Sequence, residues 1–427
     1  MQKIQPQTAQ KPPLPNGYHT IRFPITEAEY ERFLNDLDFA RAFLDGVMEQ
    51  HPEVFPEPML RHYIFYGFTA PSRKLGLRCR RVRLNRRAGP VYLLAPSFVL
   101  PYMCARTEAV EAGLLLLRFH VPYWVVAYVC GHNAMYWYRL QSGLGRFSVV
   151  GTTVKEPDEL PWHLVADEKH TRLRGQKAYV AVTAGADCIL GASLCQSVSE
   201  EALRKAYGVF AEEARQLKPG YAPETVNTDG WWATQGAWRS LFASIVVIQC
   251  FLHAFLKIRD RATKQFAAIF EAVSDKVWQA YRAETKRSFS QRIRRLGEWA
   301  QAQLEESAMK QHVLELCQKR SRFSLSYDHV GAHRTSNMVD RLMRVLDRAF
   351  FVGQYFHGQA DSAERRVRSL ALLWNFCPSS PATVRKHEGQ LCPAERLNGY
   401  RYHDNWLENL LVSASMNGYR DRQLNLG

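Results

Sequence analysis

The chain has 427 residues, of which 46% are hydrophobic, and it carries a formal net charge of +15 with an isoelectric point near 9.4. This length suits roughly two or three domains, and the basic charge favours nucleic acid over an anionic membrane as a partner. No apolar run reaches about 18 residues, so no transmembrane span is expected. The nine cysteines lack zinc-finger spacing and indicate reduced thiols in a cytosolic protein.

The N-terminal part of the chain divides into a polar tail and a basic region. Residues 1–20 are rich in Gln and Pro and are expected to be disordered. In residues 21–98, Thr26 and Glu29 predict a capping box at the start of a helix. A basic stretch that alternates with a period near two follows and predicts a β-hairpin. Its candidate nucleic-acid contacts are Arg78, Arg80, Arg81 and Arg83.

Residues 99–150 predict a group of short helices. One runs from Thr107 to Phe119, a second from Tyr123 to Cys130, and a third starts at Ala134 after a tight Gly-His-Asn turn. Helix, short turn, helix is the spacing of a helix-turn-helix DNA-binding unit. A helical packing unit without a DNA role explains the spacing equally well, and the neighbouring basic hairpin favours the DNA-binding interpretation.

From residue 160 the pattern changes to strands and then to long helices. Residues 160–254 are expected to form the first part of a core. Within them, three strands between Leu164 and Leu194 with short links predict an antiparallel meander, followed by a helix from Glu200 to Leu217 that Ser199 caps. Two further strands follow, around Val226 and from Ser244 to Cys250. Residues 255–325 predict an inserted helical domain, and residues 326–427 predict the rest of the core and C-terminal helices.

Two aspartates stand at the predicted ends of apolar strands. Asp167 ends the run from Trp162, and Asp229 ends the run from Glu224. An aspartate at a strand end is most often a turn residue. Two such tips side by side would instead form an oxygen cage for divalent metal. Glu168 is expected to point to the opposite face of its strand.

The order of these elements, with local motifs, carries a family resemblance over roughly residues 100 to 410. The chain resembles the RNase H-like fold of DDE transposases and is similar to bacterial insertion-sequence transposases of the Mutator-like group. The motifs are Val165-Ala166-Asp167, Val226-Asn227-Thr228-Asp229-Gly230, the Cys250-x-x-His253 pair, and the helix Arg334-Thr335-Ser336-Asn337-Met338-Val339-Asp340-Arg341-Leu342. The expected fold is therefore an α/β, RNase H-like mixed sheet with an inserted all-helical domain and an N-terminal helix-turn-helix-like region.

The resemblance implies that Asp167, Asp229 and Asp340 are the catalytic acids and bind two Mg²⁺ ions, for which Mn²⁺ can substitute. The chain departs from the family at Asp340, where Glu is usual, and at Met343, where the family has Asn. The alternatives for the third acid are Asp347 and Glu364. The resemblance places Cys250 and His253 near the site without fixing them as ligands, and a buried cysteine beside a hydrogen-bonded histidine is the simpler interpretation.

The resulting hypothesis is a DNA transposase that cleaves and joins strands at the ends of an insertion sequence. Its expected partner is double-stranded DNA, bound by a homodimer or higher oligomer in the bacterial cytoplasm at the nucleoid, with no role for a membrane. Trp231 and Trp232 either stack on a splayed base or pack between the sheet and the insert, and packing is favoured. The alternatives are a catalytically decayed transposase that only binds DNA and another RNase H-like nuclease.

Overall fold

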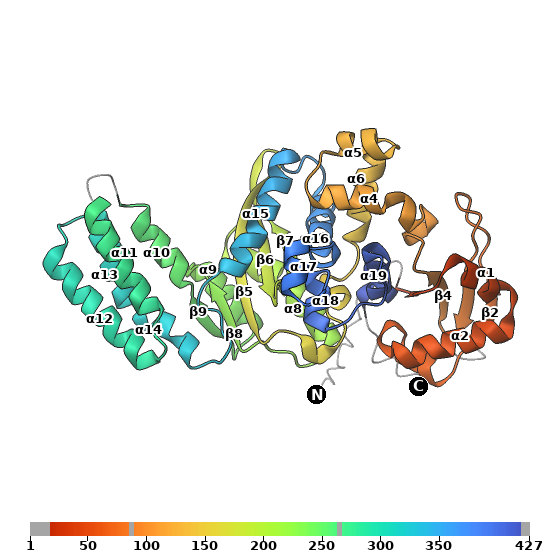
Figure 1. Cartoon of the computed structure of the whole chain (residues 1–427), viewed down its shortest axis with the longest axis horizontal. Helices are drawn as coiled ribbons and strands as arrows, with labels where there is room; N and C mark the ends of the chain where they lie inside the picture. Colours follow the sequence, from red (N-terminus) through yellow and green to blue (C-terminus); the bar gives the residue numbers. More distant parts are fainter. Residues whose placement is uncertain (1–17, 85–88, 263–266, 420–427) are drawn as a thin grey trace, which may run out of the picture.

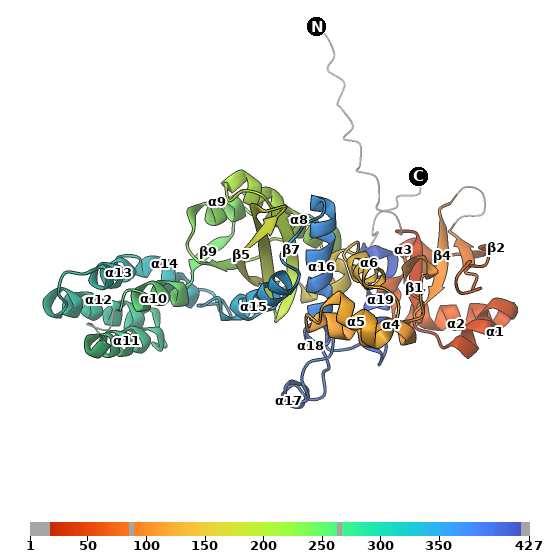
Figure 2. The same ribbon diagram turned by 90° about the horizontal axis from the view of Figure 1, so that it is seen from above.

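The computed structural model describes residues 18–84, 89–262 and 267–419. The molecule is elongated, with an N-terminal α/β unit at one end, a five-stranded sheet in the middle and a helical bundle at the other end (Figures 1 and 2). Of the tail that was predicted to be disordered, residues 1–17 lie outside the described ranges, and Thr20 already begins the first strand.

The N-terminal unit is a four-stranded sheet covered by helices. Its strand order is β1-β4-β3-β2, with β1 parallel to β4 and the other pairs antiparallel. The predicted capping box is present, and the predicted basic hairpin is formed by β3 and β4. The elements are β1 (Thr20–Phe23), α1 (Glu27–Asn35), α2 (Leu37–Gln50), η1 (Pro52–Val54), α3 (Glu57–Arg61), β2 (Ile64–Phe68), β3 (Arg80–Arg83) and β4 (Val91–Pro96).

The predicted short helices of residues 99–150 form, but they have no core of their own. Trp137 and Leu114 are fully buried in a cluster that also contains residues of the central sheet and of the C-terminal helices. The unit is therefore part of the central body rather than an independent helix-turn-helix domain. The elements are η2 (Pro101–Met103), α4 (Thr107–Arg118), α5 (Tyr123–Cys130), α6 (Ala134–Leu144), α7 (Val149–Thr153) and η3 (Pro157–Glu159).

The central sheet has the strand order β7-β6-β5-β8-β9. The first three strands form the predicted antiparallel meander, and β5, β8 and β9 run parallel to one another. Chain connections across the sheet are α8, between β7 and β8, and α9, between β8 and β9. The elements are β5 (His163–Leu173), β6 (Gln176–Gly185), β7 (Cys188–Cys195), α8 (Glu200–Leu217), β8 (Thr225–Thr228), α9 (Trp232–Leu241) and β9 (Val246–Gln249).

The alternation of side chains along β5 assigns each residue to one of two packed faces. Val165 belongs to the cluster that α15 (Asn337–Val352) and α16 (Ala360–Phe376) build, whereas Leu164 and Ala166 belong to the cluster of α8 and α9. Since successive strand residues face opposite sides, Asp167 lies on the α15 side and Glu168 on the α8 side.

The helical insert begins directly after β9 and has its own apolar core. Its helices are α10 (Phe251–Arg259), α11 (Ala267–Tyr281), α12 (Lys286–Gln303), α13 (Ala308–Gln318), α14 (Arg320–Ser324) and η5 (Leu325–Tyr327). The core reaches from Phe251 to Phe323, with Tyr327 packed against it. The insert therefore starts a few residues before the predicted boundary at 255, because α10 begins at Phe251 with Cys250 as its N-cap.

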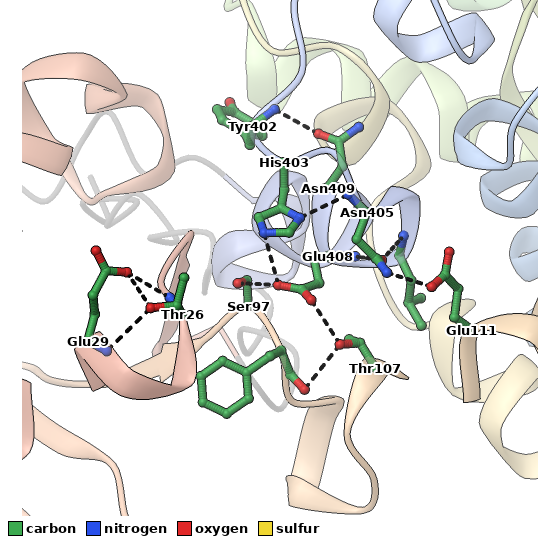
Figure 3. A network of polar contacts seen from close by, with 12 residues as sticks. Thr26, Glu29, Ser97, Thr107, Glu111, Tyr402, His403, Asn405, Glu408 and Asn409 are labelled. Atoms are coloured by element: carbon green, nitrogen blue, oxygen red, sulfur yellow. Dashed lines mark hydrogen bonds and ion pairs between the residues drawn. The ribbon is translucent and has the colours of Figure 1, made fainter. Parts of the chain in front are cut away.

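The C-terminal segment crosses back to the N-terminal unit. Figure 3 shows Glu408, on α19 (Trp406–Ser413), accepting hydrogen bonds from Ser97 (2.7 Å) and Thr107 (3.1 Å). Met416 and Tyr402 enter the core of the N-terminal unit. The remaining elements are α17 (Pro381–Lys386), α18 (Pro393–Asn398) and η6 (Ser415–Gly418). The C-terminal segment therefore packs against the N-terminal unit.

Among the described residues, no helix combines the length and the apolar character that a bilayer span requires.

Two helical glycines test how tightly the central body is packed. A Cβ atom added at Gly113 in α4 would lie 2.3 Å from the Trp137 ring, whereas a Cβ at Gly46 in α2 would meet nothing within 4 Å. We expect Gly113→Ala to destabilise the protein by about 1–3 kcal/mol despite the better helix propensity of alanine. Gly46→Ala is the matched control and should stabilise by about 0.5–1 kcal/mol. Urea unfolding followed by circular dichroism measures both, and equal effects would contradict the packing argument.

Candidate metal centre

Asp167 lies in the middle of β5, and the prediction that it ends a strand was wrong. The β5–β6 hairpin continues the strand for six residues beyond it, through the pair of Leu173 and Gln176. The parallel neighbour β8 stops earlier, at Thr228. Asp167 therefore stands where the sheet loses its parallel partner, and its carboxylate keeps access from that side. Its Oδ1 accepts a hydrogen bond from the backbone N–H of Glu168 (2.8 Å).

Asp229 follows β8 directly, on the strand next to Asp167. The ladder between β5 and β8 pairs His163 with Thr225 and Val165 with Asn227. The same sequence interval separates Asp167 from Asp229, so the two acids are level across adjacent strands, as the sequence predicted. Asp229 Oδ1 accepts the backbone N–H of Trp231 (2.8 Å), which fixes the turn into α9.

Asp340 reaches the same place from the first turn of α15. Ser336, at the N-cap of that helix, donates its hydroxyl to Asp340 Oδ2 (3.0 Å). The segment before the helix is held by Asn227, whose amide donates to the carbonyl of His333 (2.9 Å). The β8 strand and the start of α15 are thus bonded to each other, which positions the third acid.

The Cys-x-x-His pair ties this segment to the helical insert. The backbone N–H of Ser336 donates to Cys250 Sγ (3.2 Å), and the backbone N–H of Phe251 donates to the carbonyl of Arg334 (3.1 Å). The Ser336 hydroxyl also lies 3.2 Å from His253 Nδ1. Cys250 is fully buried. The start of α10 and the start of α15 therefore form one hydrogen-bonded unit.

Three side chains converge within metal-bridging distance. One ligand atom each of Asp167, His253 and Asp340 lies within 4.8 Å of the other two. Asp229 is outside this group, although its charge acts on Asp167. The carboxylates are hard oxygen donors of the kind that Mg²⁺ and Mn²⁺ prefer, so the donor set fits those ions. His253 is the member that sequence reasoning treated only as a neighbour. Its place three residues after Cys250, at the first helix after the last strand, was the available signal.

The charges in this cluster shift one another. Burial raises the pKa of Asp167 to about 6, and the negative charges of Asp229 and Asp340 add to this against the opposing effect of His253. Hydrogen bonding to Cys250 raises the pKa of His253 to about 9, with the two carboxylates Asp167 and Asp340 contributing. Without metal, this shift favours the imidazolium form of His253, which offsets the charge of the acids, and His253 would have to lose that proton to become a ligand.

Glu168 is turned away from the cluster. Its carboxylate accepts hydrogen bonds from Tyr207 (2.7 Å) on α8 and Thr234 (2.7 Å) on α9. Burial raises the pKa of Glu168 to about 7, against the effect of these two donors. The glutamate is thus a buried structural group on the opposite face of the sheet.

The alternative third acids are engaged elsewhere. Asp347, two turns along α15, forms an ion pair with Lys169 (2.6 Å). Glu364 accepts the backbone N–H of Leu194 (2.6 Å) at the edge strand β7. Neither belongs to the group of converging ligand atoms, so Asp340 is the acid that the fold brings to Asp167.

The basic hairpin divides its arginines between two faces. Arg80 is 6% exposed and donates to the carbonyls of Phe33 (2.8 Å) and Leu34 (2.9 Å) at the end of α1, so this predicted phosphate contact is wrong. Arg81 and Arg83 point the other way, and the Arg83 guanidinium lies 3.5 Å from the centre of the Tyr66 ring. Arg78 lies over Phe68 at 4.4 Å. These three arginines remain candidates for DNA contact.

The two tryptophans after Asp229 also differ. Trp231 is partly buried at the N-cap of α9, whereas Trp232 is 69% exposed. The favoured prediction of packing between sheet and insert therefore does not hold for Trp232. Its ring is exposed three residues after Asp229, so base stacking stays a prediction.

No protein-family model matches the chain. No curated protein matches it either. The converging acids and the strand order are therefore what the chain offers for assigning a function.

Proposed function

We propose that the protein is a DNA transposase with an RNase H-like core, which cleaves and joins phosphodiester bonds with divalent metal. The observation that carries the proposal is the convergence of Asp340 and Asp167 from elements far apart in the sequence, with Asp229 level with Asp167 on the next strand. Two carboxylates held this close repel each other, and a bound divalent cation would remove that repulsion.

The topology supports the same assignment. The resemblance rests on three antiparallel strands, a helix, a strand, a helix, a strand, a helical insert and a final acidic helix, and the chain has these elements in this order. The sheet adds that the strand bearing Asp167 is central and pairs with the strand before Asp229. A plain DNA-binding protein would not need this placement.

The residues have defined tasks in this proposal. Asp167, Asp229 and Asp340 would hold the ions, and bound metal supplies activation of the attacking oxygen and neutralisation of charge on the phosphate. Ser336 fixes the carboxylate of Asp340, and the β5–β8 ladder fixes the other two. His253, whose raised pKa favours the imidazolium, would add a positive charge beside the acids. The net charge of +15 attracts the DNA.

The decisive experiment uses a supercoiled plasmid that carries the DNA flanking the gene on both sides. We expect the purified protein to nick this plasmid with Mg²⁺ or Mn²⁺ and to join the freed ends to a second plasmid. Tight binding without nicking would identify a DNA-binding protein instead. Nicking without joined products would identify another nuclease.

The assignment of the third acid is testable without any DNA. Mn²⁺ at about 100 times its Kd should stabilise the wild type by about 2.7 kcal/mol, because the ion binds only the folded state. Asp340→Asn should lose most of this gain, whereas the matched control Glu364→Gln should keep it. Thermal unfolding with and without Mn²⁺ measures the difference. Loss of the gain in Glu364→Gln alone would move the third acid to α16.

A further inference from the structure

A cavity of about 430 Å³ lies between the N-terminal sheet and the end of α6, separate from the acid cluster. Its volume falls within the range of small-molecule sites, roughly 300–1,000 Å³. The residues of the candidate metal centre do not line it; these are Asp167, Asp229, His253 and Asp340. The lining comes from β1, β4, the loop between β2 and β3, the segments around η2, the end of α6 and the residues after it, with a contribution from η6.

The strand register decides which side chains face this cavity. Ile21 and Phe23 of β1 enter the core under α1 and α2, so Thr20 and Arg22 face the other way. The parallel ladder sets Arg22 beside Ala95 of β4, which also lines the cavity. The outer face of the sheet is thus the floor of the cavity, and Arg22 is its charged group.

Among the residues that the structure describes, Arg22 is a buried cation without a counter-ion. The residue is 4% exposed, and its Nε has no hydrogen-bond partner within this part of the chain. Within residues 18–84, 89–262 and 267–419, no carboxylate forms an ion pair with it. Burial lowers the pKa of Arg22 to about 10, which still leaves the guanidinium charged at neutral pH. A buried charge without a partner is costly, and a bound anion would remove that cost.

The carboxylate of Glu408 does not serve as that counter-ion. Figure 3 shows it bonded to Ser97 and Thr107, with His403 at 3.5 Å. Within the described part of the C-terminal segment, which ends at residue 419, Arg22 makes one polar contact: its backbone N–H donates to Ser415 Oγ (3.1 Å). Among the described residues, the guanidinium is therefore left facing the cavity.

The rim of the cavity carries a second arginine and strained backbone. Arg146 is exposed, and its guanidinium lies 5.2 Å from the centre of the Tyr102 ring. Tyr102 and Met103 have φ angles of +61° and +49°, which bulky residues rarely adopt. Such strain concentrates at ligand sites and switch regions. Both residues line the cavity.

The remaining lining is mainly apolar and includes Leu93, Val99, Leu100 and Phe147. We propose that this cavity binds an organic monoanion with an apolar body, whose charged head pairs with Arg22 while Arg146 closes the rim. A medium-chain carboxylate is the simplest such ligand. One buried guanidinium matches one negative charge, and the apolar walls match the body. The proposal is independent of the transposase function, since it uses none of the acids.

Isothermal titration of the full-length protein with sodium octanoate tests the proposal. We expect saturable binding of one octanoate per chain. Arg22→Met should weaken it by at least about tenfold, because the carboxylate loses its charge-assisted hydrogen bond. Arg22→Lys should weaken it less, and Arg61→Met, an exposed arginine of the same unit, should leave it unchanged.

Two comparison ligands separate the charge from the apolar body. 1-Octanol and inorganic phosphate should both bind more weakly than octanoate. Equal binding of octanol, or of phosphate, would overturn the proposal, as would an absence of octanoate binding or an unchanged affinity in Arg22→Met. Without ligand, Arg22→Met should melt no lower than the wild type, because it removes an unpaired buried charge. A clear fall in its melting temperature would show that Arg22 has a partner within the protein.

Discussion

Asp167→Asn should abolish metal-dependent DNA cleavage while leaving the fold intact. The amide keeps the shape of the side chain but removes the charge that would hold divalent metal, and Lewis-acid stabilisation of several kcal/mol corresponds to a loss of about 10³-fold or more in rate. The measurement is single-turnover nicking of the flanking-DNA plasmid with Mg²⁺. Asp347→Asn, on the same side of the sheet but paired with Lys169, should cleave at the wild-type rate.

Asp167→Asn should be more stable than the wild type, although it should lose activity. The folded-state pKa of about 6 lies above the ordinary value, so wild-type stability falls as pH rises from about 4 to about 6 and stays at the lower level above that. Asparagine removes this cost, and in metal-free buffer at pH 7.5 the variant should gain on the order of 1–3 kcal/mol. If Asp167→Asn kept about a tenth of the wild-type cleavage rate, Asp167 would not be a catalytic acid. If the variant unfolded, Asp167 would have a structural role instead.

Glu213→Gln should be the most destabilising single change in the central body. Glu213 and Arg368 are 6% and 8% exposed and form a buried ion pair between α8 and α16. The same carboxylate accepts from Ser148 (2.9 Å) and from the N–H of Val150 (3.0 Å). Glutamine leaves the guanidinium of Arg368 uncompensated, which costs about 3–5 kcal/mol. The measurement is the free energy of unfolding in urea.

The neighbouring residue provides the control for this prediction. Glu212 is exposed on the same helix, and Glu212→Gln should change stability by less than about 0.5 kcal/mol. Adding Arg368→Met to Glu213→Gln should recover part of the loss, because the orphaned charge is removed. If Glu213→Gln matched Glu212→Gln, the buried pair would not hold α8 and α16 together.

The sequence predicted most of the elements because local signals were strong. Ser199 caps α8 as expected, and α5 has the predicted bounds because Pro122 and Gly131 flank it. The length of β5 was underestimated because its second half gains its order from pairing with β6 rather than from apolar residues. The core shared by Trp137 and the central sheet was missed because it joins segments far apart in the chain.

The candidate site was predictable only in part. Asp167 and Asp229 follow from their place in apolar runs, since neighbouring parallel strands bring such positions together. Asp340 needed the family resemblance, because nothing local distinguishes it from Asp347. The position of His253 beside the acids was not predictable, because it depends on a contact with Ser336, which is 83 residues further along the chain. The sequence did not predict that Arg80 donates to carbonyls of α1, because its basic neighbours indicated contact with phosphate instead.

The two ends of the helical insert each lead to a residue of the converging group of Asp167, His253 and Asp340. The chain enters the insert at Cys250 and His253 and leaves it toward Ser336 and Asp340, and these ends are bonded to each other. A force that tilts the bundle therefore displaces His253 and Asp340 together relative to Asp167. A ligand of the bundle that changes this tilt would, by thermodynamic linkage, change the affinity of the proposed metal site for ions, and ions bound there would change the affinity of the bundle for that ligand by the same factor.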